Sequence, residues 1–235
     1  KAVPKRVKAI AMINITDVTE GIKELERTAK MGLAGGMITV YPKGRGYNSP
    51  EYESLWATAQ DPRMPLSLHI RTNRPEPARM ATIEETSQTS SANSDYWVRT
   101  SIGNMIFSGV FERYPKIWVG SVEQELSWIP HLLQAMHFTY SQRAPRPGWK
   151  RFKGDTRPSD YFHSNIFASF QEDELGIKLR NYIGVDNLMW GSDYPRIEST
   201  FPRSRQILEG ILADCTEEEK AKIAGGNAAR VYHLD

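Results

Sequence analysis

Short apolar runs alternate along the chain with longer segments in which apolar residues recur at helical spacing. Residues 7–15 (VKAIAMINI) are such a run, and Ile22, Leu25 and Ala29 recur with the helical period in the segment 19–31. Strands separated by helices are typical of βαβ units, so the pattern indicates an α/β protein with a mainly parallel sheet. Further strands are predicted at 37–41, 66–70, 116–122, 165–170 and 187–191, and further helices at 50–60, 97–114, 126–138, 173–183, 203–213 and 217–231.

Two polar segments, residues 71–94 and 142–158, interrupt this alternation and are predicted to be loops. Loops of such length are usually functional or lack fixed structure. No linker divides the chain, so we expect a single domain over residues 1–235. Thr216 followed by Glu219 is a capping box, which predicts where the last helix begins.

The composition of the chain excludes several kinds of binding partner. The net charge of +2 and the absence of any run of like charges give no reason to expect nucleic acid. The single cysteine, Cys215, excludes an intrachain disulfide framework and a CxxC metal site, and it fits a reducing compartment such as the cytoplasm. No apolar stretch approaches the roughly 18–20 residues that span a bilayer, so no membrane association is expected. The expected partner is a small-molecule substrate, and homo-oligomerisation stays open.

Chemically capable side chains follow three of the predicted strands. His69 comes after LSL, Glu123 after WVGSV and Asp193 after MWGS. In parallel βα folds the carboxyl ends of strands surround the ligand-binding mouth. Imidazole and carboxylate groups bind Zn²⁺, and a carboxylate beside a metal-bound water can take its proton. Each residue also has an ordinary explanation, because a histidine can be a structural hydrogen-bonding group, GSDYP can be a turn and Glu123 can be a solvated charge.

Four segments together resemble the amidohydrolase-related family, which includes aminocarboxymuconate semialdehyde decarboxylase and other nonoxidative decarboxylases alongside hydrolases. They are PLSLHI, GVFERYPKIWVGSVE, LMWGSDYP and EEEKAKIAGGNAARVYHL. The resemblance implies a (β/α)8 TIM-type barrel of the metal-dependent hydrolase kind. It also implies that His69 is a metal ligand and that Asp193 binds metal and handles protons.

Two departures from the family pattern affect the metal site. The chain contains no His-X-His pair, which normally ends the first strand, and six predicted strands instead of eight suggest that the first one or two are absent. Where the family often has Gly-His, this chain has Gly120 and Ser121, and serine is a poor zinc ligand. Glu123 lies two residues beyond Ser121 and is expected to face the same mouth. We therefore expect weak metal binding by this chain, and a His-X-His ahead of Lys1 would restore the site.

Three functions remain open at this stage. The leading interpretation is metal-dependent hydrolysis of a small, carboxylated substrate, with a divalent metal, zinc by preference, that activates water. The same ligands suit nonoxidative decarboxylation of an aromatic or unsaturated acid, in which a protonated side chain delivers a proton to carbon. A catalytically silent barrel that binds a partner or small molecule is the third, and the missing His-X-His and Ser121 favour it.

The predicted site residues have separate roles. Asp193 is the expected acid-base group and His69 a ligand or electrophile. Glu123 is the third candidate metal ligand. Arg71 or Arg74 is expected to hold a substrate carboxylate through a bidentate contact, and Trp190, although a natural core residue, is the remaining candidate substrate contact.

Overall fold

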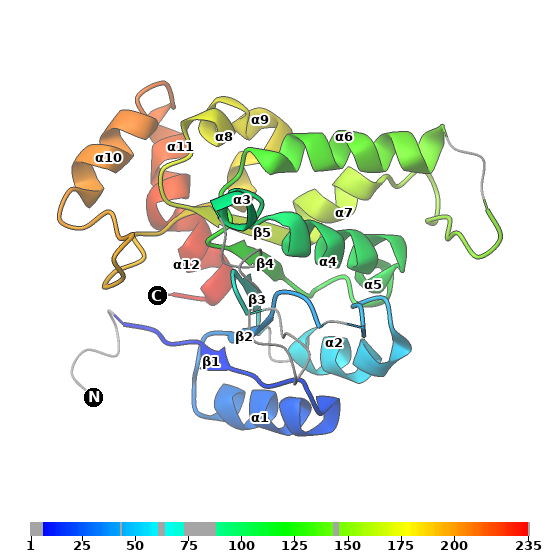
Figure 1. The fold of residues 1–235 in the computed structure, drawn as a ribbon. Helices are drawn as coiled ribbons and strands as arrows, with labels where there is room; N and C mark the ends of the chain where they lie inside the picture. The colour runs from blue at the N-terminus through cyan, green and yellow to red at the C-terminus, as the bar shows by residue number, and fades with distance from the viewer. Residues whose placement is uncertain (1–6, 43, 61–63, 73–87, 143–145, 235) are drawn as a thin grey trace.

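Six parallel strands form one sheet in the order of the sequence (Figure 1). The computed structural model describes residues 7–42, 44–60, 64–72, 88–142 and 146–234. The strands are β1 (Ala11–Met12), β2 (Gly36–Thr39), β3 (Leu66–His69), β4 (Val119–Val122), β5 (Ile166–Phe170) and β6 (Leu188–Trp190). All six predicted strands are confirmed, and each pairs in parallel with the next. The predicted α/β class with a parallel sheet is therefore confirmed.

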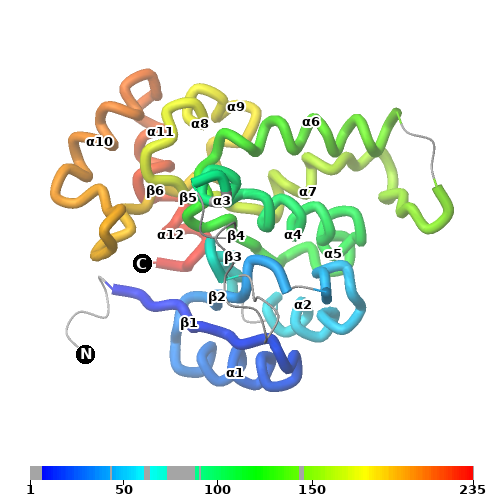
Figure 2. Tube along the Cα trace, viewed as in Figure 1, coloured from blue at the N-terminus to red at the C-terminus, as the bar shows by residue number. Residues whose placement is uncertain are grey.

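Helices connect successive strands, and Figure 2 follows the chain from α1, beside β1, to α10–α12 at the other end of the sheet. Side-chain hydrogen bonds to the backbone define where two of these helices begin, α1 and α11. Asp17 accepts hydrogen bonds from the backbone N–H groups of Thr19 and Glu20 at 2.9 and 3.1 Å, which begins α1. The helices are α1 (Val18–Lys30), α2 (Glu53–Gln60), α3 (Gln88–Ala92), α4 (Tyr96–Phe107), α5 (Val110–Arg113), α6 (Trp128–Ser141), α7 (Pro158–Asn165), α8 (Glu174–Lys178), α9 (Arg180–Ile183), α10 (Ser204–Ile211), α11 (Glu217–Ala221) and α12 (Asn227–Tyr232), with 3-10 turns η1 (Pro50–Tyr52) and η2 (Val185–Asn187) and a π-helical segment η3 (Lys222–Gly226). The predicted capping box of Thr216 and Glu219 begins α11, with both reciprocal hydrogen bonds present.

Five predicted segments differ from the structure. Two of them are helices that divide: the one expected at 173–183 into α8 and α9, and the one at 217–231 into α11, η3 and α12. The helix expected at 97–114 divides into α4 and α5 because Gly109 adopts a left-handed conformation with φ of 74°. Helix α3 lies within the predicted loop 71–94, although residues 73–87 of that loop lie outside the described part. Helix α7 was not predicted. Pro158, which was assigned to the end of a loop, lies in the first turn of this helix, where a backbone N–H would have no hydrogen-bond partner within the helix.

The two faces of the sheet pack differently. Alternate residues such as Leu68, Val119 and Ala168 join the large core beneath the helices, which defines the outer face. The residues between them define the inner face, where Phe167 and Met189 form a smaller cluster with Val231 of α12. Tyr232 and neighbouring residues of α12 cover part of this inner face, and the Tyr232 ring packs edge-on against Phe167 at 5.6 Å.

The sheet is an incomplete barrel in the part of the chain that the structure describes. No strand there pairs with the outer edge of β1 or of β6. Met12 on β1 is consequently 78% exposed, although most inner-face positions farther along the sheet are covered. Six strands, two fewer than in a closed (β/α)8 barrel, agree with the expectation that some strands are absent.

Gly120 is required by the packing of the inner face. A Cβ atom at this position would lie 2.1 Å from ring carbons of Phe167, which is itself buried. We expect Gly120→Ala to destabilise the fold by about 2 kcal/mol, because the buried ring must move. Gly103→Ala in helix α4 is the matched control, since a Cβ there meets nothing within 4 Å. Thermal unfolding should show a lower Tm for Gly120→Ala alone, and equal Tm values would contradict this account of the packing.

Candidate active site

His69 and Glu123 meet at the carboxyl edge of the sheet. His69 is the last residue of β3, and its strand partner Val122 directly precedes Glu123. The Nε2 atom of His69 lies 2.9 Å from the Oε2 atom of Glu123, and both side chains are partly buried. The structure thus brings together two residues that the sequence predicted for one site, although they lie on different strands.

The imidazole of His69 is held in one orientation. Its Nδ1 atom lies 2.8 Å from the carbonyl oxygen of Ile70. Because a carbonyl oxygen only accepts hydrogen bonds, Nδ1 must carry a proton and donate it. The other ring nitrogen, Nε2, faces the carboxylate of Glu123. Histidine ligands of metals commonly donate the other ring N–H to a carbonyl in this way.

The orientation of the Glu123 side chain differs from the one that strand alternation predicted. The expectation that Ser121 and Glu123 face the same way is wrong, because Ser121 is fully buried and pairs with Leu68 and Ala168 on the outer face. Glu123 has a φ of 61°, which breaks the alternation beyond β4, and its backbone N–H donates to Ser169 Oγ at 3.1 Å. A sequence pattern of period two cannot show such a reversal.

Asp193 follows β6 and carries a buried carboxylate oxygen. Within the described residues its Oδ2 atom accepts no hydrogen bond, and it forms an ion pair with Arg196, whose Nε lies 3.6 Å away. Burial raises the pKa of Glu123, the charge of Asp193 raises it further, and His69 opposes the shift. Asp193 therefore lies near enough to Glu123 to act on it electrostatically. A buried carboxylate oxygen that accepts no hydrogen bond is uncommon, and it can receive one from a ligand, a proton or water.

Unusual backbone conformations concentrate at the same edge. Positive φ angles occur at Arg71 (58°) after β3, at Glu123 (61°) and Glu125 (52°) after β4, and at Asp193 (53°) after β6. Residues other than glycine seldom adopt this conformation, and such strain is typical of functional sites. The clustering supports the carboxyl edge as the site independently of the side-chain chemistry.

The other predicted substrate contacts are placed differently. Arg71 is exposed at the turn after β3, whereas Arg74 lies outside the described residues. The indole of Trp190 packs against the outer core and donates its Nε1–H to the carbonyl of Gln171 at 3.2 Å. Its role as a substrate contact therefore stays a prediction.

Glu125 is a member of this edge that the sequence interpretation did not include. Burial raises its pKa to about 7, with the nearby Asp173 charge adding to the shift and backbone hydrogen bonds from Gln171 and Glu172 opposing it. Its position in the sequence indicated this placement, since Glu125 lies two residues beyond Glu123, after the same strand. Nothing in the sequence, however, distinguished it from a solvated acid.

The described residues fit a divalent metal only in part. Among them, no three His, Cys, Asp or Glu side chains are grouped closely enough to hold a metal ion. His69 and Glu123 are in contact and the Asp193 carboxylate is nearby, so the donor types are suitable but the set is incomplete. Water or groups beyond the described residues would have to complete the coordination.

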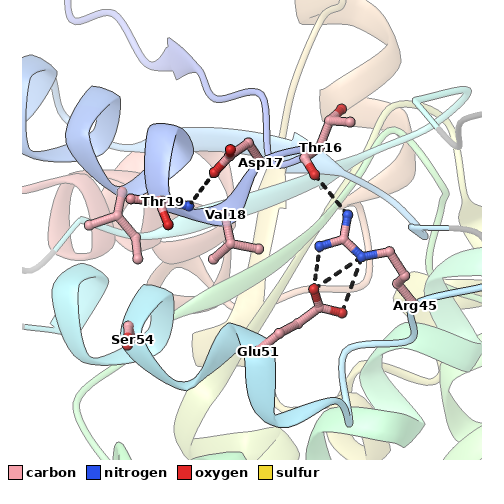
Figure 3. A pocket seen from close by; sticks show the side chains of 8 residues that line it. Thr16, Asp17, Val18, Thr19, Arg45, Glu51 and Ser54 are labelled. Atoms are coloured by element: carbon pink, nitrogen blue, oxygen red, sulfur yellow. Dashed lines mark hydrogen bonds and ion pairs between the residues drawn. The ribbon is translucent and has the colours of Figure 1, made fainter.

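A separate pocket of about 430 Å³ lies beside the amino end of α1 (Figure 3). Figure 3 shows the guanidinium of Arg45 bound to the carboxylate of Glu51 and to the carbonyl oxygen of Thr16, the last at 2.8 Å. Asp17 on the same wall caps the helix. The charged groups of this pocket are thus already paired, and none of its lining residues belongs to the edge described above.

The family of the chain is shown by a family model described as Amidohydrolase, which matches residues 1–234. The chain therefore belongs to the amidohydrolase family, as its motifs predicted. No helix in the described part of the chain is long and apolar enough to cross a membrane.

Curated relatives of the chain are decarboxylases. Gamma-resorcylate decarboxylase of Polaromonas sp. is 22% identical, over 99% of this chain and 72% of the relative. The 2-amino-3-carboxymuconate-6-semialdehyde decarboxylase of Dictyostelium discoideum is 24% identical, over 99% of this chain and 62% of the relative. The chain thus spans between about three fifths and three quarters of these proteins.

Solved structures confirm the fold. The 5-carboxyvanillate decarboxylase of Sphingomonas paucimobilis superimposes with a TM-score of 0.81 at 23% identity, over 99% of this chain and 68% of that one. A dihydroxybenzoic acid decarboxylase of Polaromonas sp., with bound manganese and the inhibitor 2-nitroresorcinol, gives 0.77 at 20% identity, over 98% and 70%. The relatives' names favour the decarboxylase alternative over the leading hydrolase interpretation, and the metal named is manganese instead of zinc.

Proposed function

We propose that this protein is a metal-dependent, nonoxidative decarboxylase of an aromatic carboxylic acid. The observation that carries the proposal is the agreement among relatives: the decarboxylases of Polaromonas and Dictyostelium both align with 99% of the chain. Hydrolysis, the leading interpretation from sequence, has no such support. The buried acidic edge around Asp193 suits either reaction, so the choice rests on the relatives.

The chain's own residues supply a proton route for this reaction. The bond between the ring carbon and the carboxylate breaks, its electron pair stays on the ring carbon, and carbon dioxide leaves. The ring carbon must then receive a proton. We assign this proton to the carboxyl group of Asp193, which takes it up from water before each turnover and whose Oδ2 atom accepts no hydrogen bond from the described residues. Arg71, exposed beside the site, is the proposed anchor for a substrate carboxylate.

The residues proposed to hold a divalent metal are His69, Glu123 and Asp193. A bound divalent cation at this edge would supply positive charge that orients an anionic substrate. The fixed Nδ1–H donation of His69 keeps Nε2 available as a ligand. Since these three residues do not form a complete set, the affinity of this chain for metal is expected to be low.

The proposal predicts carbon dioxide release from a hydroxylated benzoate, such as 2,6-dihydroxybenzoate or 5-carboxyvanillate, in the presence of MnCl₂. Chelation should abolish turnover and added Mn²⁺ should restore it, while Zn²⁺ is tested in parallel. Because binding is weak, little metal should remain after gel filtration, and activity should depend on free Mn²⁺. His69→Gln should lose at least about a hundredfold in kcat/KM.

His131→Gln is the matched control, because His131 is exposed on helix α6. Its activity should stay within about twofold of the unaltered protein. Hydrolysis of amide or ester substrates without any carbon dioxide release would favour the hydrolase interpretation. Saturable binding of a benzoate with no turnover at any metal concentration would favour a silent barrel.

A further inference from the structure

Thr72 lies at the point where the chain leaves β3, and its hydroxyl group joins two strand ends. The hydroxyl donates to the carbonyl oxygen of His69 at 2.6 Å and accepts from the backbone N–H of Val40 at 2.7 Å. Val40 follows β2, the strand that pairs with β3. A regular ladder would offer this N–H a backbone carbonyl on the neighbouring strand. Here the chain turns away at Arg71, and the Thr72 side chain takes the place of that partner.

A second threonine, Thr39 on β2, also forms a hydrogen bond with this turn. The Thr39 hydroxyl donates to the carbonyl oxygen of Thr72, and the Tyr47 hydroxyl donates in turn to the carbonyl of Thr39. Tyr47 is fully buried and Thr39 is 8% exposed, so little water competes for these bonds. The turn after β3 is therefore fastened to β2 by side-chain hydroxyl groups.

This fastening acts on the conformation that orients His69. The backbone of Arg71 is left-handed, with φ of 58°, a strained state that persists only when surrounding contacts hold it. The carbonyl that accepts the Nδ1–H of His69 belongs to Ile70, inside the same turn. If the turn relaxes, this carbonyl moves, and the ring loses the bond that keeps Nε2 directed at Glu123.

We propose that Thr72 is a positioning residue that fixes the orientation of the His69 ring through the turn 69–72. The consequence for turnover rests on the proposed function, whereas the consequence for the ring does not. Thr72→Val keeps the shape of the side chain and removes only the hydroxyl. Thr72→Ser keeps the hydroxyl and removes the methyl group.

The test is an NMR spectrum of ¹⁵N-histidine-labelled protein, in which each ring nitrogen signal depends on the hydrogen bonds that the nitrogen makes. His69→Gln identifies the signals of His69. We expect the Nδ1 signal of His69 to be the same in the unaltered protein and in Thr72→Ser, and to be shifted in Thr72→Val, where the bond to the Ile70 carbonyl is lost. With a benzoate substrate, kcat should fall about tenfold in Thr72→Val and stay within about twofold in Thr72→Ser.

Thr58→Val is the matched control, because the Thr58 hydroxyl donates to the helix carbonyl of Ser54, away from the site. An unchanged His69 signal in folded Thr72→Val overturns the proposal, whether or not the protein turns over a benzoate. If Thr72→Val does not fold, Thr72→Ser decides, since an altered Nδ1 signal despite the retained hydroxyl also overturns it. Changed ring signals without decarboxylation in the unaltered protein would uphold the positioning role and reject the proposed function.

Discussion

Asp193→Asn is expected to reduce decarboxylation by about a hundredfold to ten-thousandfold, the range typical for loss of a proton-transfer group. Asparagine has nearly the volume of aspartate but carries no acidic proton. Oδ2 of Asp193 accepts no hydrogen bond in the described part of the chain, and its ion pair with Arg196, at 3.6 Å, is half exposed on the arginine side, so the fold should depend little on it. The loss should therefore fall on kcat, with KM changed much less.

The measurement is steady-state turnover of a benzoate at saturating Mn²⁺, with circular dichroism to verify the fold. Asp155→Asn is the matched control, because Asp155 is exposed in the segment before α7. Its activity should equal that of the unaltered protein. Turnover of Asp193→Asn within a few-fold of the unaltered protein would remove Asp193 from the proton route.

The order of elements was predictable because apolar periodicity reports which side of an element is buried. Residues 19–31 and 66–70 were placed within a residue or two of α1 and β3 for that reason. Boundaries set by one backbone conformation were not predictable in this way. Gly109 ends α4 by turning left-handed, and the sequence gives equal reason for a glycine to continue or to break a helix.

The site was predictable at the level of strand ends and not at the level of orientation. His69 and Glu123 were expected near one mouth, and they are in contact. The reason given for Glu123 failed, because its left-handed backbone, and not alternation from Ser121, directs it to His69. The contacts of Thr72 with Val40 depend on a turn whose geometry no local pattern encodes. Short-range patterns thus identified the ligand-type residues, and long-range hydrogen bonds determined their arrangement.

Asp173 fastens the loop after β4 to the loop after β5. Its carboxylate accepts hydrogen bonds from the backbone N–H groups of Leu126, Ser127 and Gly176, each at 2.7 Å, and from the Ser127 hydroxyl. Burial by itself would raise the pKa of Asp173, but these hydrogen bonds together outweigh it and lower the pKa below the ordinary 3.8. The folded state therefore favours the charged carboxylate.

Asp173→Asn is expected to lower the free energy of unfolding at pH 7 by about 3 kcal/mol, because an amide cannot accept all four bonds and its NH₂ group opposes an N–H donor. For a chain of this size the Tm should fall by about 6–12 °C.

The effect should depend on pH. A carboxyl group whose pKa is lowered by folding stabilises the fold at pH values above its unfolded-state pKa, and this stabilisation is lost as the pH falls through its folded-state pKa. The difference in Tm between the unaltered protein and Asp173→Asn should thus be constant from pH 5 to 8 and narrow below about pH 4. Asp155→Asn, exposed and without these bonds, should show no such difference at any pH. Equal Tm values at pH 7, or a gap that widens in acid, would show that Asp173 does not stabilise the fold as a charged acceptor.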